Sequence, residues 1–365
     1  MDKSPAISIV IPTYNHGDII PETIGYIKAQ TFCDFEVILV DDKSPDDSME
    51  AANKAIAGDE RFKLFSNEKN IGTSGTRNRG LDEATGKYVL FLDDDDIYQE
   101  SMLEDFYHIA EANQVDITIC KVGHFHVDTN EMKYADYYWQ YIPFGNDFVE
   151  YGDMPEYWAL VFRPSVWNKF YRRDFLVDHG IRFVNSVRED EIFSLESELN
   201  VDKIGLIDKP LMAHRLGHRQ QTTMIMNSYT SNMNWWPHLK RIREQAKEAG
   251  NPYFVRGIDA RIASVMIHTF NHAVRYTKNS DWMEYIKWVN EIFFYCGWDK
   301  CESQYFLPPH DNDYLQAKAI VEGSYINNDF EHIKTLKAHI EEFTNSKSWK
   351  ITRPLRKVGK LFGRP

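Results

Sequence analysis

Short apolar runs alternate with helix-like segments over the first part of the chain. Runs rich in isoleucine, valine and aromatic residues predict buried strands at residues 6–12, 35–40, 61–65 and 87–92. The segments between them predict helices at residues 19–30, 48–57 and 74–84. This alternation indicates an α/β fold with a mixed, mainly parallel sheet flanked by helices. In such a sheet, ligands bind beyond the carboxyl ends of the strands.

The rest of the chain has a different pattern. After one more predicted strand at 116–120, an aromatic stretch at 134–158 is expected to form loops that shape a pocket. Apolar residues with a 3.6-residue period then predict a helical module. The last twenty residues contain seven cations and no acid. We therefore predict an α/β domain at 1–226, a helical module at 227–345 and a basic tail at 346–365.

The composition excludes several classes of protein. With 43% hydrophobic and 14% aromatic residues, the chain of 365 residues is too apolar to be disordered. Its net charge of −13 argues against a broad nucleic-acid surface. No apolar run approaches the roughly 18–20 residues of a membrane-spanning helix, and the N-terminus lacks a secretion signal. We therefore expect a cytoplasmic protein, whose four cysteines are ordinary, mostly buried thiols.

Two groups of aspartates directly follow predicted strands. Asp41 and Asp42 follow the second strand, and the run from Asp93 to Asp96 follows the fourth, so both groups fall on the ligand edge. Adjacent carboxylates repel one another by about 1 kcal/mol per close pair even in water, which a cation would offset. Oxygen ligands favour Mg²⁺ or Mn²⁺, which bridge diphosphate oxygens. Alternatively, Asp96 caps the next helix and the other acids are solvated, but their place at two strand ends favours the metal.

A segment with three glycines lies between the two aspartate groups. Residues 70–80 could bring backbone N–H groups and the charge of Arg77 to a phosphate. The spacing of Gly72, Gly75 and Gly80 matches neither the dinucleotide fingerprint nor the P-loop. A dehydrogenase therefore loses its main support.

Ordered motifs over about residues 6–220 resemble those of glycosyltransferase family 2. The matching segments are Ile9 to Asn15, Val40 to Ser44, Asn70 to Asp96, Val166 to Arg173, Gly180 to Phe183 and Arg188 to Phe193. The resemblance implies a Rossmann-like GT-A fold and inverting sugar transfer, as in bacterial enzymes that build cell-surface polysaccharides and glycoconjugates. It also implies Mn²⁺ or Mg²⁺ as cofactor and a nucleotide-sugar as donor, with UDP as the usual nucleotide.

The resemblance implies a metal site within the run of aspartates. Asp95 corresponds to the direct metal ligand, with Asp93 nearby and Asp94 facing the ribose or sugar of the donor. Because four aspartates are adjacent, the ligand could be one position away. In many GT-A enzymes a histidine or basic segment closes over the metal or diphosphate, and His214 or His218 could do so here. Lone histidines are more often structural, however, and the spacing identifies no specific site.

The resemblance also implies which residues contact the nucleotide. Pro12 and Tyr14 lie in the nucleotide-binding turn, where Tyr14 stacks near the base. Asp42 is implied to recognise the base, and Arg77 to approach the base or the phosphates.

Asp190 is implied as the general base. An acceptor hydroxyl attacks the anomeric carbon opposite the leaving nucleoside diphosphate, and a carboxylate that accepts its proton contributes roughly 10²–10⁴-fold. A bound metal ion would offset the charge of the leaving group. From the residues alone, Glu189 and Asp190 also fit an acid pair at a helix N-terminus.

Other features concern the acceptor and partners. Trp139, Tyr141, Trp158 and Trp167 could stack on sugars, although such aromatic residues most often pack against the protein. The basic tail could lie on an anionic membrane that presents the acceptor, or it could be solvated or docked on the protein. The helical module could mediate homodimerisation or bind the acceptor.

Two other functions share some of these features. A sugar-phosphate nucleotidyltransferase also uses Asp-bound Mg²⁺, but it would need a glycine- and lysine-rich turn where this chain has Tyr14 to Asp18. A non-catalytic carbohydrate or nucleotide-sugar binding protein would not need Asp190 beside a metal site. The sequence therefore favours a metal-dependent glycosyltransferase that moves a sugar to a hydroxyl of a glycan, lipid-linked or protein-linked acceptor.

Overall fold

The computed structural model describes six segments of the chain. These are residues 4–134, 147–150, 165–186, 188–217, 234–276 and 282–296. The chain forms two compact units, one of residues 1–226 and 230–258, the other of residues 227–229 and 259–365. The predicted division at residues 226 and 345 stays a prediction.

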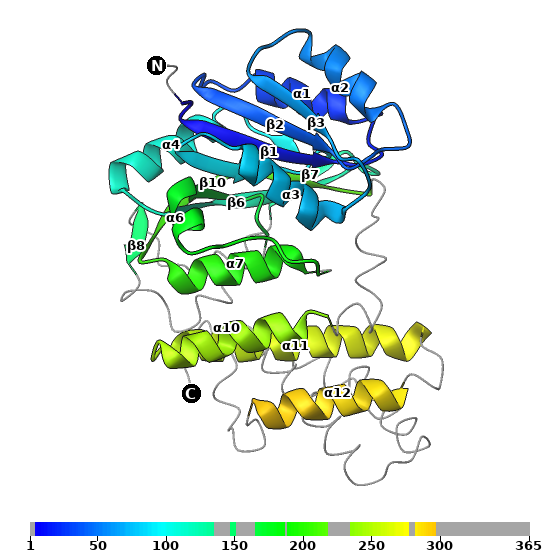
Figure 1. The fold of residues 1–365 in the computed structure, drawn as a ribbon, viewed down its shortest axis with the longest axis vertical. Coiled ribbons are helices and arrows are strands. Elements are labelled where there is room, and N and C mark those ends of the chain that lie inside the picture. The colour runs from blue at the N-terminus through cyan, green and yellow to red at the C-terminus, as the bar shows by residue number, and fades with distance from the viewer. Residues whose placement is uncertain are drawn as a thin grey trace. The chain divides into compact units, whose positions relative to one another are not determined.

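One sheet organises the first unit (Figure 1). Its path runs β3-β2-β1-β4-β9-β6-β10-β5, and two short strands pair beside this path, β7 with β6 and β8 with β10. The strands are β1 (Ile7–Thr13), β2 (Phe35–Asp41), β3 (Phe62–Ser66), β4 (Tyr88–Phe91), β5 (Ile97–Tyr98), β6 (Ile117–His126), β7 (Glu131–Tyr134), β8 (Phe148–Glu150), β9 (Lys169–Arg172) and β10 (Lys203–Leu216).

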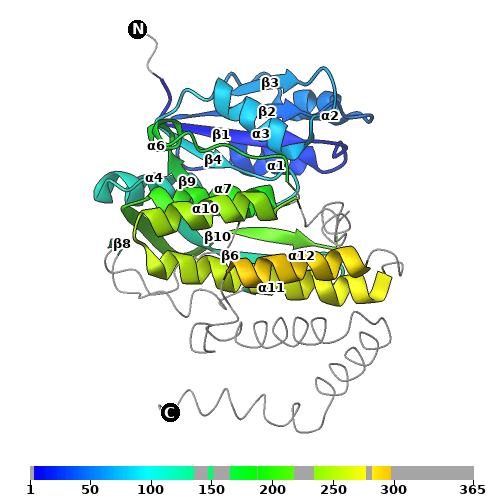
Figure 2. The ribbon, with the colours of Figure 1, turned by 60° about the horizontal axis from the view of Figure 1, so that its bottom comes forward.

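The strand directions make the sheet mixed. The first four strands are mutually parallel in the order β3-β2-β1-β4, which Figure 2 displays from a second direction. Strand β9 is antiparallel to β4 and β6, whereas β6 and β10 are parallel. The predicted α/β sheet is thus confirmed, and the parallel register of β1, β2 and β4 places the ends of these strands at one edge.

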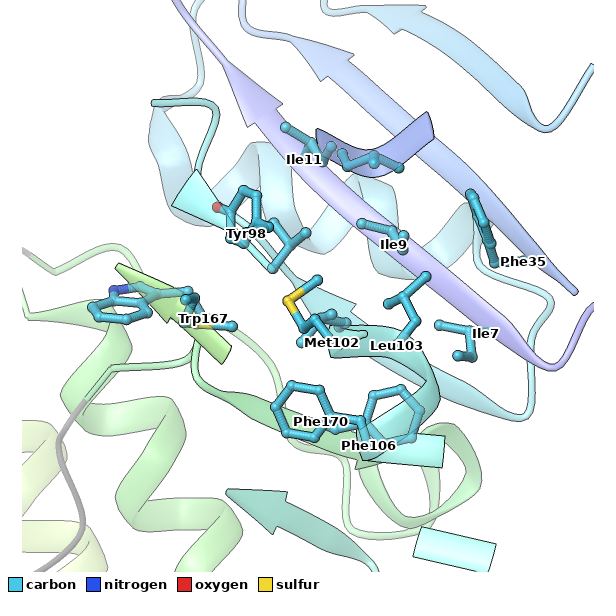
Figure 3. Close-up of a cluster of buried hydrophobic side chains, with 14 of the residues drawn as sticks. Ile7, Ile9, Ile11, Phe35, Tyr98, Met102, Leu103, Phe106, Trp167 and Phe170 are labelled. Atoms are coloured by element: carbon cyan, nitrogen blue, oxygen red, sulfur yellow. The ribbon is translucent and has the colours of Figure 1, made fainter. Parts of the chain in front are cut away.

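Helices cover both faces of this sheet. They are α1 (Ile20–Lys28), α2 (Ser48–Ile56), α3 (Gly72–Glu83), α4 (Met102–Asn113), α6 (Arg173–Asp178) and α7 (Glu189–Asn200). The later helices of the chain are α10 (Trp236–Glu248), α11 (Pro252–Tyr276) and α12 (Trp282–Tyr295). Helices α1, α2 and α4 bury apolar residues against the face of β1 that carries Ile7, Ile9 and Ile11 (Figure 3). Helix α3 lies on the opposite face, where a side chain at Gly80 would collide with Val10.

The periodic pattern of the later chain also forms helices. Trp235 is buried just before α10, and Leu239 and Ile242 are buried on this helix. Helix α10 packs against α7 within the first unit. Ile258 and Ile262 are buried on α11, and α12 buries a further set that includes Val289 and Ile292. Within the described residues, no helix is long and apolar enough to cross a membrane.

Several predicted features fall partly or wholly outside the described residues. Of the aromatic stretch, residues 135–146 and 151–158 lie outside, and so do His218 and the basic tail. Cys120 and Cys296 are buried, whereas Cys33 is exposed.

Candidate active site

Two turns carry the aspartates at the carboxyl edge of the sheet. Strand β2 ends at Asp41, which is in register with Thr13 of β1, and the run from Asp93 to Asp96 begins just beyond β4. The Leu92 N–H donates to the Val10 carbonyl and keeps the chain alongside β1 up to the first of these aspartates. The prediction that both groups lie at one edge is therefore confirmed.

The Asp94 carboxylate is held by the last residue of β1 and by a residue that follows it. Thr13 Oγ1 donates to one carboxylate oxygen, and His16 Nδ1 lies 2.7 Å from the other. Thr23 Oγ1 donates to the Asp94 carbonyl at 2.7 Å. The hydrogen bond to Asp94 raises the pKa of His16 to about 9, so this histidine is a cation at neutral pH. In this structure Asp94 thus connects the aspartate turn to β1 and α1, and its role toward the donor stays a prediction.

Asp96 is fully buried and bonds to β10, not to the next helix. Its Oδ1 accepts the Arg215 N–H at 2.9 Å and lies 3.1 Å from His214 Nδ1. Its Oδ2 is buried and has no hydrogen-bond partner within the described residues. Helix α4 begins after Ser101 without a side-chain cap. The alternative interpretation of Asp96 as a helix cap is therefore wrong, because the turn directs its carboxylate toward β10.

The Asp95 side chain has no hydrogen-bond donor in the part of the chain that the structure describes. Burial, together with the negative charges of Asp96, Asp93 and Asp94, raises the pKa of Asp95 to about 7. A carboxylate that is partly buried among like charges is stabilised by a bound cation.

The donor set fits a divalent ion that a substrate helps to bind. Among the described residues, no three His, Cys, Asp or Glu side chains converge to form a complete metal site. Mg²⁺ is commonly held by one or two carboxylates together with substrate phosphates, and Mn²⁺ shares this preference for oxygen ligands. The unpartnered carboxylate of Asp95 and the accessible carboxylate of Asp93, 28% exposed, fit this arrangement.

Arg77 connects the aspartate turn to the start of α7. Its Nη2 donates to Asp93 Oδ1 at 2.7 Å, while its Nη1 donates to Asp190 and lies 3.4 Å from Glu189 Oε1. Burial raises the pKa of Glu189 to about 7, reinforced by the charge of Asp190. Burial also raises the pKa of Asp190, which the guanidinium of Arg77 opposes. The structure thus brings together Asp93 and Asp190, which were predicted for two different tasks.

Glu189 and Asp190 also lie in the first turn of α7. The helix-terminal position that the residues alone suggested is therefore present, and the contact with Arg77 is additional to it. Arg77 itself contacts carboxylates in this structure, and its predicted approach to a base or phosphate stays a prediction.

Asp42, which was predicted to contact the base, lies at the N-terminus of α3. Both Asp42 oxygens accept hydrogen bonds, from Asn67 Nδ2 at 2.9 Å and from the N–H groups of Ile71 and Gly72 at 2.8 Å. Asp42 therefore stabilises the helix start, and any contact with a base would use its remaining lone pairs. Pro12 is buried in β1, whereas Tyr14 just beyond it is 38% exposed.

His214 lies between Asp96 and two aromatic side chains. Its ring stacks on Trp167 with centroids 5.9 Å apart and meets His124 edge-on at 6.2 Å. Burial alone would lower its pKa, but the hydrogen bond and charge of Asp96 raise it above its ordinary value. Trp167 is only 7% exposed, which agrees with the packing alternative. Trp139, Tyr141 and Trp158 lie outside the described residues.

Sequence reasoning missed the residues that hold the aspartate turn in place. Thr13, His16 and Thr23 bind Asp94 from 71 to 81 positions away, and Tyr98 Oη donates to the Asp93 carbonyl at 2.6 Å. No local spacing marks such contacts, because they depend on which strands are neighbours.

Comparisons with known proteins show which family the chain resembles. The profile of the family "Glycosyl transferase family 2" matches residues 8–176. The uncharacterised glycosyltransferase YibD of Escherichia coli is 27% identical over 264 residues, which are 69% of this chain and 73% of that protein. The cholesterol galactosyltransferase of Borreliella burgdorferi is 27% identical over 261 residues, 68% of this chain and 71% of that protein.

A solved structure shares the fold. The crystal structure of Staphylococcus aureus TarS residues 1–349 in complex with UDP has a TM-score of 0.64 and 21% sequence identity. The similarity covers 89% of this chain and 92% of that one. The mixed sheet with flanking helices is accordingly the GT-A fold that the motifs predicted.

Proposed function

Since the chain is a glycosyltransferase whose catalytic domain belongs to glycosyltransferase family 2, we propose that it transfers a sugar from a UDP-sugar to a hydroxyl group. The acceptor is a glycan, a lipid-linked or a protein-linked glycoconjugate, and the transfer inverts the anomeric carbon. UDP is proposed because it is the usual donor nucleotide of the family and because TarS, which shares the fold, has been solved with UDP.

The observation that carries this proposal is the position of Arg77 between two carboxylates. One terminal nitrogen bonds to Asp93 in the aspartate turn and the other to Asp190 at the start of α7. A carboxylate suited to a metal ion and a carboxylate suited to a proton therefore lie within reach of one guanidinium. Single-displacement sugar transfer needs these two groups on opposite sides of one reacting carbon.

The residues divide the work between donor and acceptor. Asp95 and Asp93 would hold Mn²⁺ or Mg²⁺, which supplies positive charge to the diphosphate leaving group. Tyr14 and Asp42 would contact the base, Asp94 the ribose or sugar, and His214 the diphosphate side. Asp190 would accept the proton of the attacking hydroxyl, because a free hydroxyl is a poor nucleophile at neutral pH.

A donor screen tests this proposal. The full chain is incubated with UDP-, GDP- and other nucleotide-sugars in the presence of Mn²⁺, Mg²⁺ or EDTA, and released nucleoside diphosphate is measured. We expect release from a UDP-sugar that depends on the metal ion. Release that EDTA leaves unchanged would contradict the metal assignment. Formation of a nucleotide-sugar from a nucleoside triphosphate and a sugar phosphate would instead identify a nucleotidyltransferase.

We also propose that the basic tail, residues 346–365, contacts the anionic inner face of the cell membrane. A second proposal is that the helical module, residues 227–345, mediates homodimerisation. Cations among apolar residues attract anionic lipid by about 1 kcal/mol each near the surface. Deleting the tail should then weaken binding to vesicles that contain phosphatidylserine. Unchanged binding would rule out the membrane contact, and a monomeric mass for the full chain in solution would rule out the dimer.

A further inference from the structure

Arg77 is a buried cation surrounded by three carboxylates. Its side chain is 4% exposed, and its two terminal nitrogens point to different parts of the site, Nη2 to Asp93 and Nη1 to Asp190 and Glu189. A guanidinium is planar, permanently charged and able to donate from both ends at once. One rigid group therefore sets the separation between the Asp93 and Asp190 carboxylates.

The neighbours of Arg77 fix its own position. The guanidinium carbon lies 5.3 Å from the centroid of the Phe183 ring, and that ring stacks on Phe193 of α7 at 4.1 Å. Asn78 binds the Phe183 backbone twice, donating to its carbonyl at 2.8 Å and accepting its N–H at 3.0 Å. Ser74 Oγ donates to the Val184 carbonyl at 2.8 Å. Because the Phe183 ring and the carboxylates surround it, the Arg77 side chain has few alternative rotamers.

These contacts come from one face of α3. Arg77 and Asn78 follow Ser74 by three and four residues, so both lie beside Ser74 on the helix surface. Two of them hold the segment just before α7, and the third holds the first turn of α7. The helix that begins at the predicted nucleotide site therefore also positions the predicted base.

We propose that Arg77 is a positioning residue that holds the Asp190 carboxylate at a fixed separation from Asp93. This role differs from the contact with the base or phosphates that the family resemblance implies, and it rests on the proposed function of Asp190 as general base. Lysine cannot replace arginine here, because an ammonium is a point charge and does not bridge two groups in a fixed plane. A displacement of about 1 Å at a reacting group can reduce a rate about 10²-fold.

Substitution of Arg77 tests the proposal in the full-length protein. For Arg77→Lys, with UDP-sugar and Mn²⁺ at saturation, we expect kcat to fall about 10²-fold while the Kd of the UDP-sugar changes less than about threefold. The matched control is Arg182→Gln, which removes an exposed ion pair with Asp82 between the same helix and the same segment. It should keep wild-type kcat and Kd.

The outcomes separate this proposal from the proposed function. If wild type and Arg182→Gln transfer sugar and Arg77→Lys does so equally well, the positioning role is refuted and the proposed function stands. If Arg77→Lys weakens donor binding but keeps kcat at saturation, Arg77 is a donor ligand instead. If wild type itself transfers no sugar from any donor, it is the proposed function that fails.

A second variant guards against misfolding of Arg77→Lys. Asn78→Ala removes both hydrogen bonds to the Phe183 backbone and leaves every charged group in place. We expect a several-fold loss in kcat with an unchanged donor Kd. A wild-type kcat in this variant, with its thermal unfolding midpoint lowered, would show that the contacts of α3 serve stability only.

Discussion

At the amino ends of the strands Glu36 is surrounded by protein donors, whereas at the carboxyl ends Asp95 has none within the described residues. Glu36 is 4% exposed and accepts hydrogen bonds from Ser8 Oγ at 2.7 Å, from the N–H and hydroxyl of Thr85 at 2.8 Å, and from Lys63 Nζ at 2.6 Å. Burial alone would raise the pKa of Glu36, but the hydrogen bonds from Lys63 and Ser8 lower it. The pKa of Asp95 is instead raised to about 7.

This difference separates a structural carboxylate from one that we propose binds a metal ion. A buried acid with all its donors in place stabilises the fold and leaves nothing for a substrate to supply. A partly buried acid among like charges destabilises the metal-free protein, and this strain is relieved when a cation binds. The carboxyl edge contains both kinds, since Asp42 and Asp94 have protein donors while Asp95 has none among the residues that the structure describes.

The largest expected effect is a loss of sugar transfer when Asp190, the proposed general base, is replaced. Asp190→Asn should reduce sugar transfer by at least roughly 10²–10⁴-fold, because an amide cannot accept the proton of the acceptor hydroxyl. Donor binding should be nearly unchanged, since the proposed partner of Asp190 is the acceptor hydroxyl. The measurements are turnover with acceptor and donor, and calorimetric binding of the UDP-sugar. Turnover close to that of wild type would refute the assignment of the base.

The second largest effect is expected at Asp95, where substitution should lower activity but not stability. Asp95→Asn should reduce metal-dependent transfer by about 10²-fold or more, because it weakens the charge stabilisation of the leaving group. The midpoint of thermal unfolding of the metal-free protein should stay the same or rise, because one of several repelling charges is removed. Asp82→Asn, at an exposed ion pair, is the control and should change neither quantity. A marked fall in the unfolding midpoint would mean that Asp95 is a structural carboxylate like Glu36.

Glu36→Gln should give the reverse result. We expect the free energy of unfolding at pH 7 to fall by about 1–3 kcal/mol, because an amide cannot accept all the hydrogen bonds that reach this carboxylate. Transfer activity should remain at the wild-type level, because Glu36 lies at the opposite end of the strands. Urea unfolding and the donor assay measure the two quantities. A loss of activity in the folded variant would remove the distinction between the two ends of the sheet.

The part of the fold that the sequence predicts best is also the most regular part. Strands β1, β2 and β4 are mainly apolar and buried along their whole length, so their residues alone predict them. Strand β9 reads Lys-Phe-Tyr-Arg and is four residues long, and its neighbours β4 and β6 are distant in sequence. Nothing local marks such a strand, since its stability comes from the strands on either side.

The same reasoning applies to the site. The shared edge of the two aspartate groups follows from parallel strands and could be predicted. The contacts of Arg77 with Glu189 and Asp190 span 112 and 113 positions and depend on how α3 and α7 pack around Phe183. Similarly, the bond between His16 and Asp94 depends on the adjacency of β1 and β4. Composition and spacing contain no information about these pairings, so only the structure reveals that Asp93 and Asp190 share one guanidinium.

The smallest expected effect is a difference in how the stability of two variants, Glu36→Gln and Glu189→Gln, changes with pH. The pKa of Glu36 is lower in the folded chain than its ordinary value of 4.5, so its stabilisation is complete above about pH 4.5 and is lost as the pH falls further. The pKa of Glu189 is raised from 4.5 to about 7, so its destabilising contribution is absent well below pH 4.5, grows between pH 4.5 and 7, and is complete above pH 7. Relative to metal-free wild type, Glu36→Gln should therefore lose its deficit as the pH falls toward 3, whereas Glu189→Gln should gain stability between about pH 4.5 and 8. Thermal unfolding midpoints over pH 3–8 measure both trends. If the two variants gave parallel curves, the pKa values of Glu36 and Glu189 would not be shifted in opposite directions, and the prediction would be wrong.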